Sequence, residues 1–162
     1  MKIDQTKLSL RKASSADIET LIDHRIIFLK EVHCNPSPEL EASVRQSLRQ
    51  YLAKAFANDT FVSWIAEYEN KPVGFSGIVF REQPGNFELP AGRTGYILNM
   101  FTVREFRQNG IGSSLFQKLL EEAKLRGLDK VELHATRDGE PVYRKFKFTE
   151  PHDIALEIIL TG

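Results

Sequence analysis

The chain has 162 residues, and its 22 basic and 22 acidic side chains give a formal net charge of zero. This length suits one domain, expected over residues 1–162, and is short for two ordinary ones. Balanced charge gives no broad electrostatic footprint for nucleic acid or an anionic membrane, and no apolar run approaches the roughly 20 residues that span a bilayer.

The N-terminal half is predicted to form one strand, two helices and a hairpin. Apolar residues alternate with polar ones in the first strand, and they recur at helical spacing in both helices. Ser14 followed by Asp17 is typical of a capped helix start, and prolines separate the two helices. The predicted ranges are a strand at 8–13, helices at 14–31 and 38–58, and hairpin strands at 61–68 and 73–80.

The C-terminal half is predicted to alternate strands with helices. Residues 96–103 form a nearly continuous apolar run of strand length, which predicts a central strand buried on both faces. A helix with an apolar stripe follows and ends at Gly127, where a C-terminal cap belongs. The remaining ranges are a strand at 131–135, helical turns at 141–145 and a closing strand at 154–160. This order of elements predicts an α/β sandwich.

The most informative segment connects the predicted central strand to the next helix and reads Arg107-Gln108-Asn109-Gly110-Ile111-Gly112-Ser113-Ser114. The first N–H groups of a helix lack internal partners and carry the positive end of its dipole. Two glycines let this backbone approach a ligand without a Cβ in the way. These features predict an anion site with a diphosphate as its natural guest, and Arg104 and Arg107 can add positive charge.

Other interpretations of this turn compete. A phosphate-binding P-loop needs a lysine after the second glycine, where Ser113 stands. A dinucleotide-binding fingerprint needs a third glycine or alanine where Leu115 stands, and it normally lies in the opening strand–helix unit of a domain. An isolated G-x-G is also compatible with a tight turn that holds no ligand.

Residues 107–112 match a longer pattern in full: Gln or Arg, two variable residues, Gly, one variable residue, then Gly or Ala. With the lead-in at 101–106, and with 141–148 standing for a second signature (Leu-Tyr-x-x-x-Gly-Phe), the chain resembles the GNAT superfamily of N-acetyltransferases. The resemblance extends over essentially the whole chain. It implies a mixed, mostly antiparallel central sheet, flanked by helices on both faces and splayed at the cofactor site.

The resemblance further implies that acetyl-CoA is the cosubstrate. The backbone of Phe101, Thr102 and Val103 would pair with its pantetheine arm. Residues of the turn would bind the cofactor, mainly through backbone N–H groups around the diphosphate: Arg107, Gln108, Asn109, Gly110, Ile111, Gly112, Ser113 and Ser114. Thr136 stands where many members carry an asparagine, and it can still hydrogen-bond the cofactor arm.

The implied reaction is direct attack of a primary amine on the thioester, through a tetrahedral intermediate and without an acyl-enzyme. The amine must lose a proton, and the departing thiolate benefits from gaining one. Tyr143 corresponds to the family's general-acid tyrosine. From the residues alone, it can also be a packing tyrosine in a short helix.

The general base is left open. Several family members place a glutamate where this chain has Asn99, which cannot usefully accept a proton. His134, on the next predicted strand, is the candidate because imidazole exchanges protons near neutral pH, although a lone strand histidine is often a packing residue. Glu132, on the same face of that strand, and a water relaying to Glu82 are the alternatives.

A second departure from the family pattern is Lys147, which replaces the usual glycine before Phe148. If that glycine serves a positive φ, the turn at Lys147 must differ here. Neither this change nor Asn99 removes the predicted anion site.

The remaining predictions concern partners and location. The acceptor is a small-molecule or peptide amine, which the resemblance places among residues 26–51 and 81–94, and a non-catalytic acyl-CoA-binding or sensing domain is the alternative function. No nucleic acid, membrane or metal is expected, since the histidines lack ligand spacing. The single cysteine, Cys34, and an N-terminus without an apolar core indicate a cytoplasmic protein. Homodimers are common in the family, and the sequence does not decide between monomer and dimer.

Overall fold

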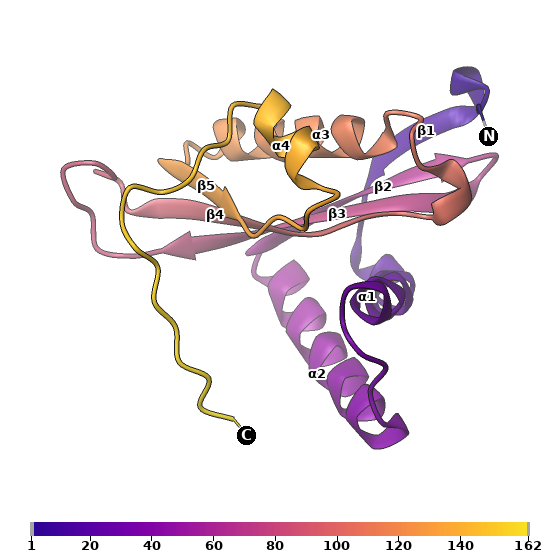
Figure 1. Cartoon of the computed structure of the whole chain (residues 1–162), viewed down its shortest axis with the longest axis horizontal. Helices are drawn as coiled ribbons and strands as arrows, with labels where there is room; N and C mark the ends of the chain where they lie inside the picture. Colours follow the sequence, from indigo (N-terminus) through magenta and orange to yellow (C-terminus); the bar gives the residue numbers. More distant parts are fainter. Residues whose placement is uncertain (1, 162) are drawn as a thin grey trace.

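The computed structural model describes residues 2–161, which form a five-stranded sheet with helices on both faces (Figure 1). The strands are β1 (Leu8–Lys12), β2 (Phe61–Tyr68), β3 (Lys71–Glu82), β4 (Arg93–Thr102) and β5 (Lys130–Leu133). The α-helices are α1 (Ile18–Val32), α2 (Pro38–Ala57), α3 (Ile111–Leu125) and α4 (Glu140–Lys145). None of the helices described is both long and apolar enough to cross a membrane. Met1 and Gly162, the ends of the expected domain, lie outside the described residues.

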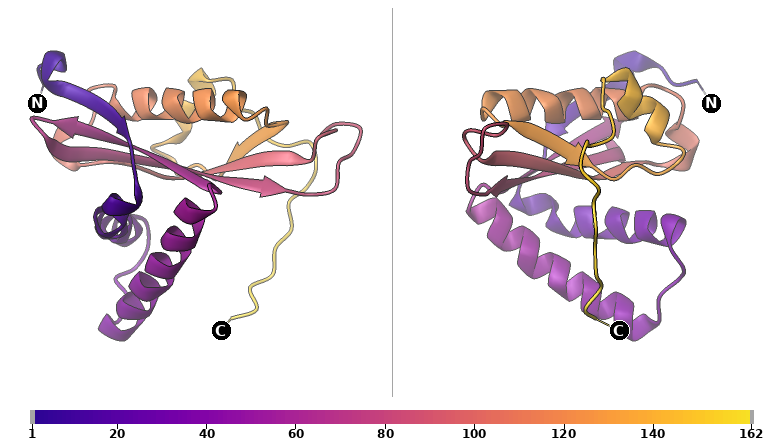
Figure 2. Two further views of the ribbon diagram at one scale, coloured as in Figure 1. Left: turned by 180° about the vertical axis from the view of Figure 1, so that it is seen from behind. Right: turned by 60° about the vertical axis from the view of Figure 1, so that its left-hand side comes forward.

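The strands lie in the sheet in their sequence order, β1 to β5. The first four are antiparallel neighbours, and β5 lies parallel to β4 after a crossover through α3. Helices α3 and α4 cover one face of the sheet, and α1 and α2 cover the other (Figure 2). The predicted mixed, mostly antiparallel sheet with helices on both faces is therefore confirmed.

Each face of the sheet has its own apolar core. On one face, Leu21 and Ile22 of α1 and Leu52 of α2 pack together with Phe75 of β3. On the other face, α3 contributes side chains that are almost completely buried: Ile111, Leu115, Phe116 and Leu119. The central strands are thus covered on both sides, which explains why β3 and β4 read as nearly continuous apolar runs.

Local sequence signals set the helix ends as predicted. Ser14 and Asp17 form a reciprocal capping box, in which the Asp17 carboxylate accepts the Ser14 N–H at 2.9 Å. Helix α2 begins at Pro38, behind the capping hydroxyl of Ser37. Helix α3 ends just before Gly127, whose φ of +62° suits a glycine at this C-terminal position.

The prediction of a closing strand at residues 154–160 is wrong. Residues 154–161 form neither helix nor strand, and they run away from the sheet as an extended tail (Figure 1). Five large apolar side chains of this tail are 78–91% exposed: Ile154, Leu156, Ile158, Ile159 and Leu160. Apolar residues with a period of two predict a strand only where a neighbouring strand can pair with it, and within residues 2–161 no strand pairs with this segment.

Lys147, just after α4, adopts a left-handed backbone conformation with φ of +67°. The turn therefore keeps the positive φ that a glycine would serve, so the expected difference in this turn is not found. An L-residue in this conformation brings its Cβ close to the following carbonyl oxygen, which costs about 1–2 kcal/mol. The Lys147 N–H donates to the Arg144 carbonyl at 2.9 Å, which holds the turn in place.

Lys147→Gly is expected to raise the free energy of unfolding by about 1 kcal/mol, because glycine has no Cβ to clash at positive φ. Chemical denaturation measures the change. Lys147→Ala is the matched control, since it removes the same charge but keeps the Cβ, and it should be no more stable than the wild type. Equal stability of the glycine and alanine variants would show that this conformation carries no strain.

Candidate functional site

Strand β4 separates from β5 partway along its length. The two strands pair only between residues 94–97 and residues 130–133. Strand β4 then continues to Thr102, whereas β5 ends. In the part of the chain that the structure describes, no strand pairs with residues 98–102 on the β5 side. Because buried backbone N–H and C=O groups require partners, this opening is suited to bind an extended ligand, as the predicted splay implies.

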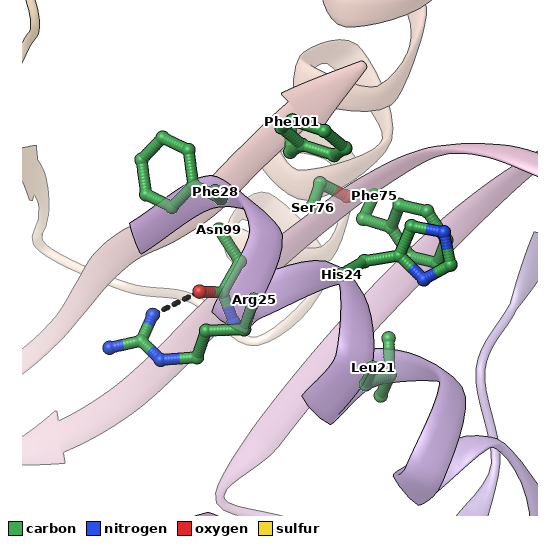
Figure 3. A pocket seen from close by; sticks show the side chains of 8 residues that line it. All are labelled: Leu21, His24, Arg25, Phe28, Phe75, Ser76, Asn99 and Phe101. Atoms are coloured by element: carbon green, nitrogen blue, oxygen red, sulfur yellow. Dashed lines mark hydrogen bonds between the residues drawn. The ribbon is translucent and has the colours of Figure 1, made fainter. Parts of the chain in front are cut away.

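A bulge in β4 lies at the start of the opening. Leu98 of β4 pairs with Gly77 of β3, and Phe101 pairs with Phe75. Two residues of β4 therefore lie opposite one residue of β3, so β4 carries one extra residue there. Asn99 lies in the bulge with φ of +59°, a conformation that asparagine tolerates better than most residues. The Asn99 side chain lies beside α1, where its Oδ1 accepts a hydrogen bond from the Arg25 guanidinium (Figure 3).

Helix α3 begins at an open glycine turn. Gly110 precedes the helix with φ of +79°, and no side chain caps the helix start. A Cβ placed on Gly110 or Gly112 would meet no atom within 4 Å, so the space over the first turn is open. The N–H groups of the first helical residues, Ile111 to Ser113, have no acceptors within the helix. This geometry fits the predicted anion site.

The side chains of Arg107 and Asn109 support the turn. Arg107 donates from Nε to the Thr102 carbonyl at 2.8 Å, and its guanidinium pairs with Glu31 of α1 at 2.6 Å. Asn109 donates to two backbone carbonyls within the turn, each at 3.1 Å, and accepts the Ile3 N–H at 3.2 Å. The charge of Arg107 is therefore directed toward the end of β4 and α1.

Tyr143 lies on α4 and packs against α3. Its ring centre is 5.1 Å from that of Phe116, and burial raises the pKa of the Tyr143 phenol above its ordinary value. The turn into α4 is closed by Thr136, whose Oγ1 accepts the Gly139 N–H at 3.2 Å. None of the hydrogen bonds among the described residues uses the Tyr143 hydroxyl, so this protonated group is suited to donate to a ligand.

His134 and Tyr96 form a pair at the end of the β4–β5 contact. His134 is exposed just beyond β5, and its Nδ1 lies 2.7 Å from the Tyr96 hydroxyl on β4. The Arg81 guanidinium lies 4.5 Å from the centre of the Tyr96 ring. Sequence reasoning identified His134 but missed Tyr96, because Tyr96 looked like one more member of an apolar strand and its partner depends on strand register.

The two glutamates considered as alternative bases are placed differently. The Glu132 carboxylate lies 2.9 Å from Lys130 and 3.6 Å from Arg81, so two cations already neutralise it. Glu82 is exposed at the end of β3, opposite Arg93. His134 differs from both glutamates in its contact with the Tyr96 hydroxyl at the end of the β4–β5 pairing.

A hollow of about 270 Å³ lies between α1, α2 and the sheet. It is lined mostly by apolar residues: Leu21, Arg25, Ser47, Leu48, Tyr51, Leu52, Phe61, Val79, Leu98 and Asn99. A much smaller hollow beside it, shown in Figure 3, shares Leu21, Arg25 and Asn99. Because residues 98 and 99 also begin the unpaired part of β4, the larger hollow borders the opening. Part of the expected acceptor region contributes to it, but the loop at 81–94 does not.

Known proteins resemble this chain over most of its length. Residues 26–148 match the model of the Acetyltransferase (GNAT) family. A predicted acetyltransferase from Clostridium acetobutylicum, solved with acetyl-CoA, is 33% identical with a TM-score of 0.86, and the match covers 94% of this chain and 96% of that chain. A GCN5-related N-acetyltransferase from Ralstonia eutropha JMP134 is 25% identical with a TM-score of 0.81, covering 93% and 98%.

Two further findings bound this similarity. The fold is shared with glucosamine-6-phosphate N-acetyltransferase from Arabidopsis thaliana, at 16% identity and a TM-score of 0.69, covering 95% of this chain and 99% of that chain. None of the curated protein sequences matches the chain significantly. The similarity therefore shows the family and the fold, and it does not identify the acceptor.

Gly112→Glu is expected to lower the affinity for coenzyme A by about 100-fold or more, because a carboxylate would fill the open space at the anion site and repel a diphosphate. The same change should not destabilise the protein, since acidic residues favour helix N-termini and glycine disfavours helices. Calorimetric titration and thermal unfolding measure the two effects.

The matched control is Gln117→Glu, which adds the same charge on an exposed position of α3. It should bind coenzyme A like the wild type. Undiminished affinity in Gly112→Glu would contradict the placement of the anion site.

Proposed function

The chain belongs to the acetyltransferase (GNAT) family, and from that premise we propose that it transfers the acetyl group of acetyl-CoA to a primary amine. The opening between β4 and β5 carries the proposal. It lies between an open glycine turn, suited to a diphosphate, and an apolar hollow, suited to an acceptor. A donor with a diphosphate and an amide-bearing arm complements the turn and the unpaired strand together.

The residues present fit acetyl-CoA, which supplies an acetyl group as a reactive thioester. We assign its diphosphate to the backbone N–H groups of residues 108–113, over the open turn. We assign its pantetheine arm to backbone groups of β4. The Thr102 carbonyl is already occupied by Arg107, and the Val103 N–H donates to the Val73 carbonyl at 2.9 Å. The arm would therefore use the groups that remain along residues 98–103.

We assign removal of the amine proton to His134. When the Tyr96 oxygen accepts a hydrogen bond from Nδ1–H, Nε2 carries the lone pair and is free to accept a proton. Tyr96 would then fix both the tautomer and the direction of the ring. The Asn99 amide cannot act as a base, and its oxygen is already bonded to Arg25.

We assign the proton for the departing thiolate to Tyr143. Attack by the amine would form the C–N bond and a tetrahedral intermediate, with His134 receiving the amine proton. Collapse of that intermediate would break the C–S bond, and the sulfur would receive a proton from the phenol. Because burial raises the pKa of Tyr143, the phenol keeps its proton through the neutral range. Gly139 lies beside the Tyr143 hydroxyl, and because glycine has no side chain it leaves this hydroxyl unobstructed.

The proposal is tested by incubating the protein with acetyl-CoA and a panel of amines while following release of free thiol. Release that depends on one class of amine supports the proposal. Coenzyme A binding without release would favour the second candidate, a non-catalytic acyl-CoA sensor, for which Asn99 in place of a carboxylate is the specific observation. Absence of coenzyme A binding would contradict both.

Tyr143→Phe is expected to lower kcat by about 10- to 100-fold while leaving the affinity for coenzyme A unchanged, because only the donated proton is lost. A raised pKa means that the acid form persists at neutral pH and is lost only as the pH rises through that raised value. The wild-type kcat should therefore show its Tyr143-dependent decline only at high pH, and the variant should lack it. Tyr68→Phe, the same change at the end of β2, is the control. An unaltered kcat in Tyr143→Phe would remove this residue from the mechanism.

His134→Gln is expected to lower kcat/KM by about 100-fold, and Tyr96→Phe by about 10-fold, since the first removes the base and the second only its orientation. The double variant should be no slower than His134→Gln alone, because Tyr96 acts through His134. His33→Gln, at an exposed loop position, is the control. Additive losses in the double variant would show that the two residues act independently.

A further inference from the structure

Arg25 places a positive charge at the larger hollow, between α1, α2 and the sheet. It extends from α1, lines both hollows, and lies beside the bulge of β4 (Figure 3). The one hydrogen bond that its guanidinium donates to a described residue goes to the Asn99 amide oxygen. A guanidinium has five N–H donors and stays charged in proteins, so most of its donors are free for a ligand.

The environment of Arg25 differs from that of the other arginines. Seven of them have a carboxylate within 4 Å: Arg11, Arg45, Arg49, Arg81, Arg107, Arg126 and Arg144. Three others, Arg93, Arg104 and Arg137, lack an ion pair but are exposed. Among residues 2–161, Arg25 is thus the arginine that is sheltered from solvent without an ion pair.

Burying a cation without a counter-ion is energetically unfavourable. Burial accordingly lowers the pKa of the Arg25 guanidinium. No acidic residue, lysine or second arginine lines the hollow. A single unpaired guanidinium in an apolar cavity is complementary to one carboxylate, which it can bind in a bidentate manner.

Asn99 keeps this guanidinium available. A glutamate or aspartate at position 99 would pair with Arg25 and neutralise it. The neutral amide instead accepts one N–H and leaves the remaining donors unpaired. The asparagine that replaces the family's glutamate at position 99 is therefore the residue that leaves Arg25 without an ion pair.

Building on the proposed acetyl transfer, we propose that the acceptor is a free apolar amino acid whose carboxylate binds Arg25. Its side chain would lie against the apolar wall formed by Leu48, Leu52, Phe61 and Val79. In an α-amino acid the amine and the carboxylate share one carbon. Anchoring the carboxylate beside Asn99 therefore holds the amine at the opening of β4, where the acetyl donor would lie.

The experiment compares leucine and phenylalanine with their carboxamides, with the matching amines that lack the carboxyl group, and with phosphoethanolamine. Thiol release gives kcat and KM for each acceptor, and calorimetry on coenzyme A-saturated protein gives binding without turnover. The wild type should prefer each amino acid to its carboxamide by about 10- to 100-fold, the range of a charge-assisted hydrogen bond.

Two variants remove the carboxylate preference by different routes. Arg25→Gln removes the charge, and Asn99→Asp neutralises Arg25 in place while keeping its side chain. Both should raise KM for the amino acids. Both should also bring the ratio of kcat/KM for each amino acid to kcat/KM for its carboxamide close to one. Arg25→Lys, which keeps the charge, should retain part of the preference for the amino acid. Arg93→Gln, at an exposed arginine without an ion pair, should keep the wild-type ratio.

The outcomes separate this inference from the acetyl transfer on which it builds. Amino acid binding that depends on Arg25, without thiol release, would support the carboxylate site and count against acetyl transfer. Equal use of acids and amides, a preference for phosphoethanolamine, or an unchanged ratio in both variants would overturn the inference. Thiol release with the amines that lack a carboxyl group, together with no detectable amino acid binding, would also overturn it.

Discussion

Strand β4 carries one residue more than β3 across the same span, and Asn99 takes up the excess in a left-handed conformation. A bulge bends its strand and increases the local twist. The bulge follows directly after the last residues of β4 that pair with β5. The separation of the two strands, the unpaired β4 backbone groups and the Asn99 side chain beside α1 all lie at this irregularity.

The sheet separates two layers, each with its own apolar core. Helix α3 and its core lie on one side, and α1 and α2 with a second core lie on the other. In our account the donor approaches from the start of α3 and the acceptor from the hollow under α1 and α2. The two can meet only where the sheet is open. In our account, this confinement allows Tyr143, packed against α3, and Arg25, on α1, to act on one reaction from opposite layers.

Features set by local sequence were predictable, and features set by strand register were not. The Gly110 turn, the capped start at Ser14 and the order of elements follow from short-range rules on glycine, caps and periodicity. The bulge at Asn99 and the Tyr96–His134 pair depend on which residues of distant segments face each other. No single-sequence pattern reports such pairings.

Two other outcomes illustrate the same limit. The helical periodicity of residues 14–31 does not distinguish Arg25, whose partly buried position beside Asn99 without a carboxylate appears only in the structure. The tail at residues 154–160 has the alternation of a strand, yet a strand forms only with a partner. Apolar periodicity shows that a segment can form a strand, and a neighbouring strand to pair with determines whether it does.

Amide hydrogen exchange of the wild-type protein, with and without coenzyme A, tests the central claim most directly. If the donor binds the glycine turn and the unpaired edge of β4, coenzyme A should slow exchange at residues 108–113 and 98–103 and leave β1 and β2 unchanged. Protection that appears elsewhere, with these two segments unaffected at saturating coenzyme A, would contradict the account.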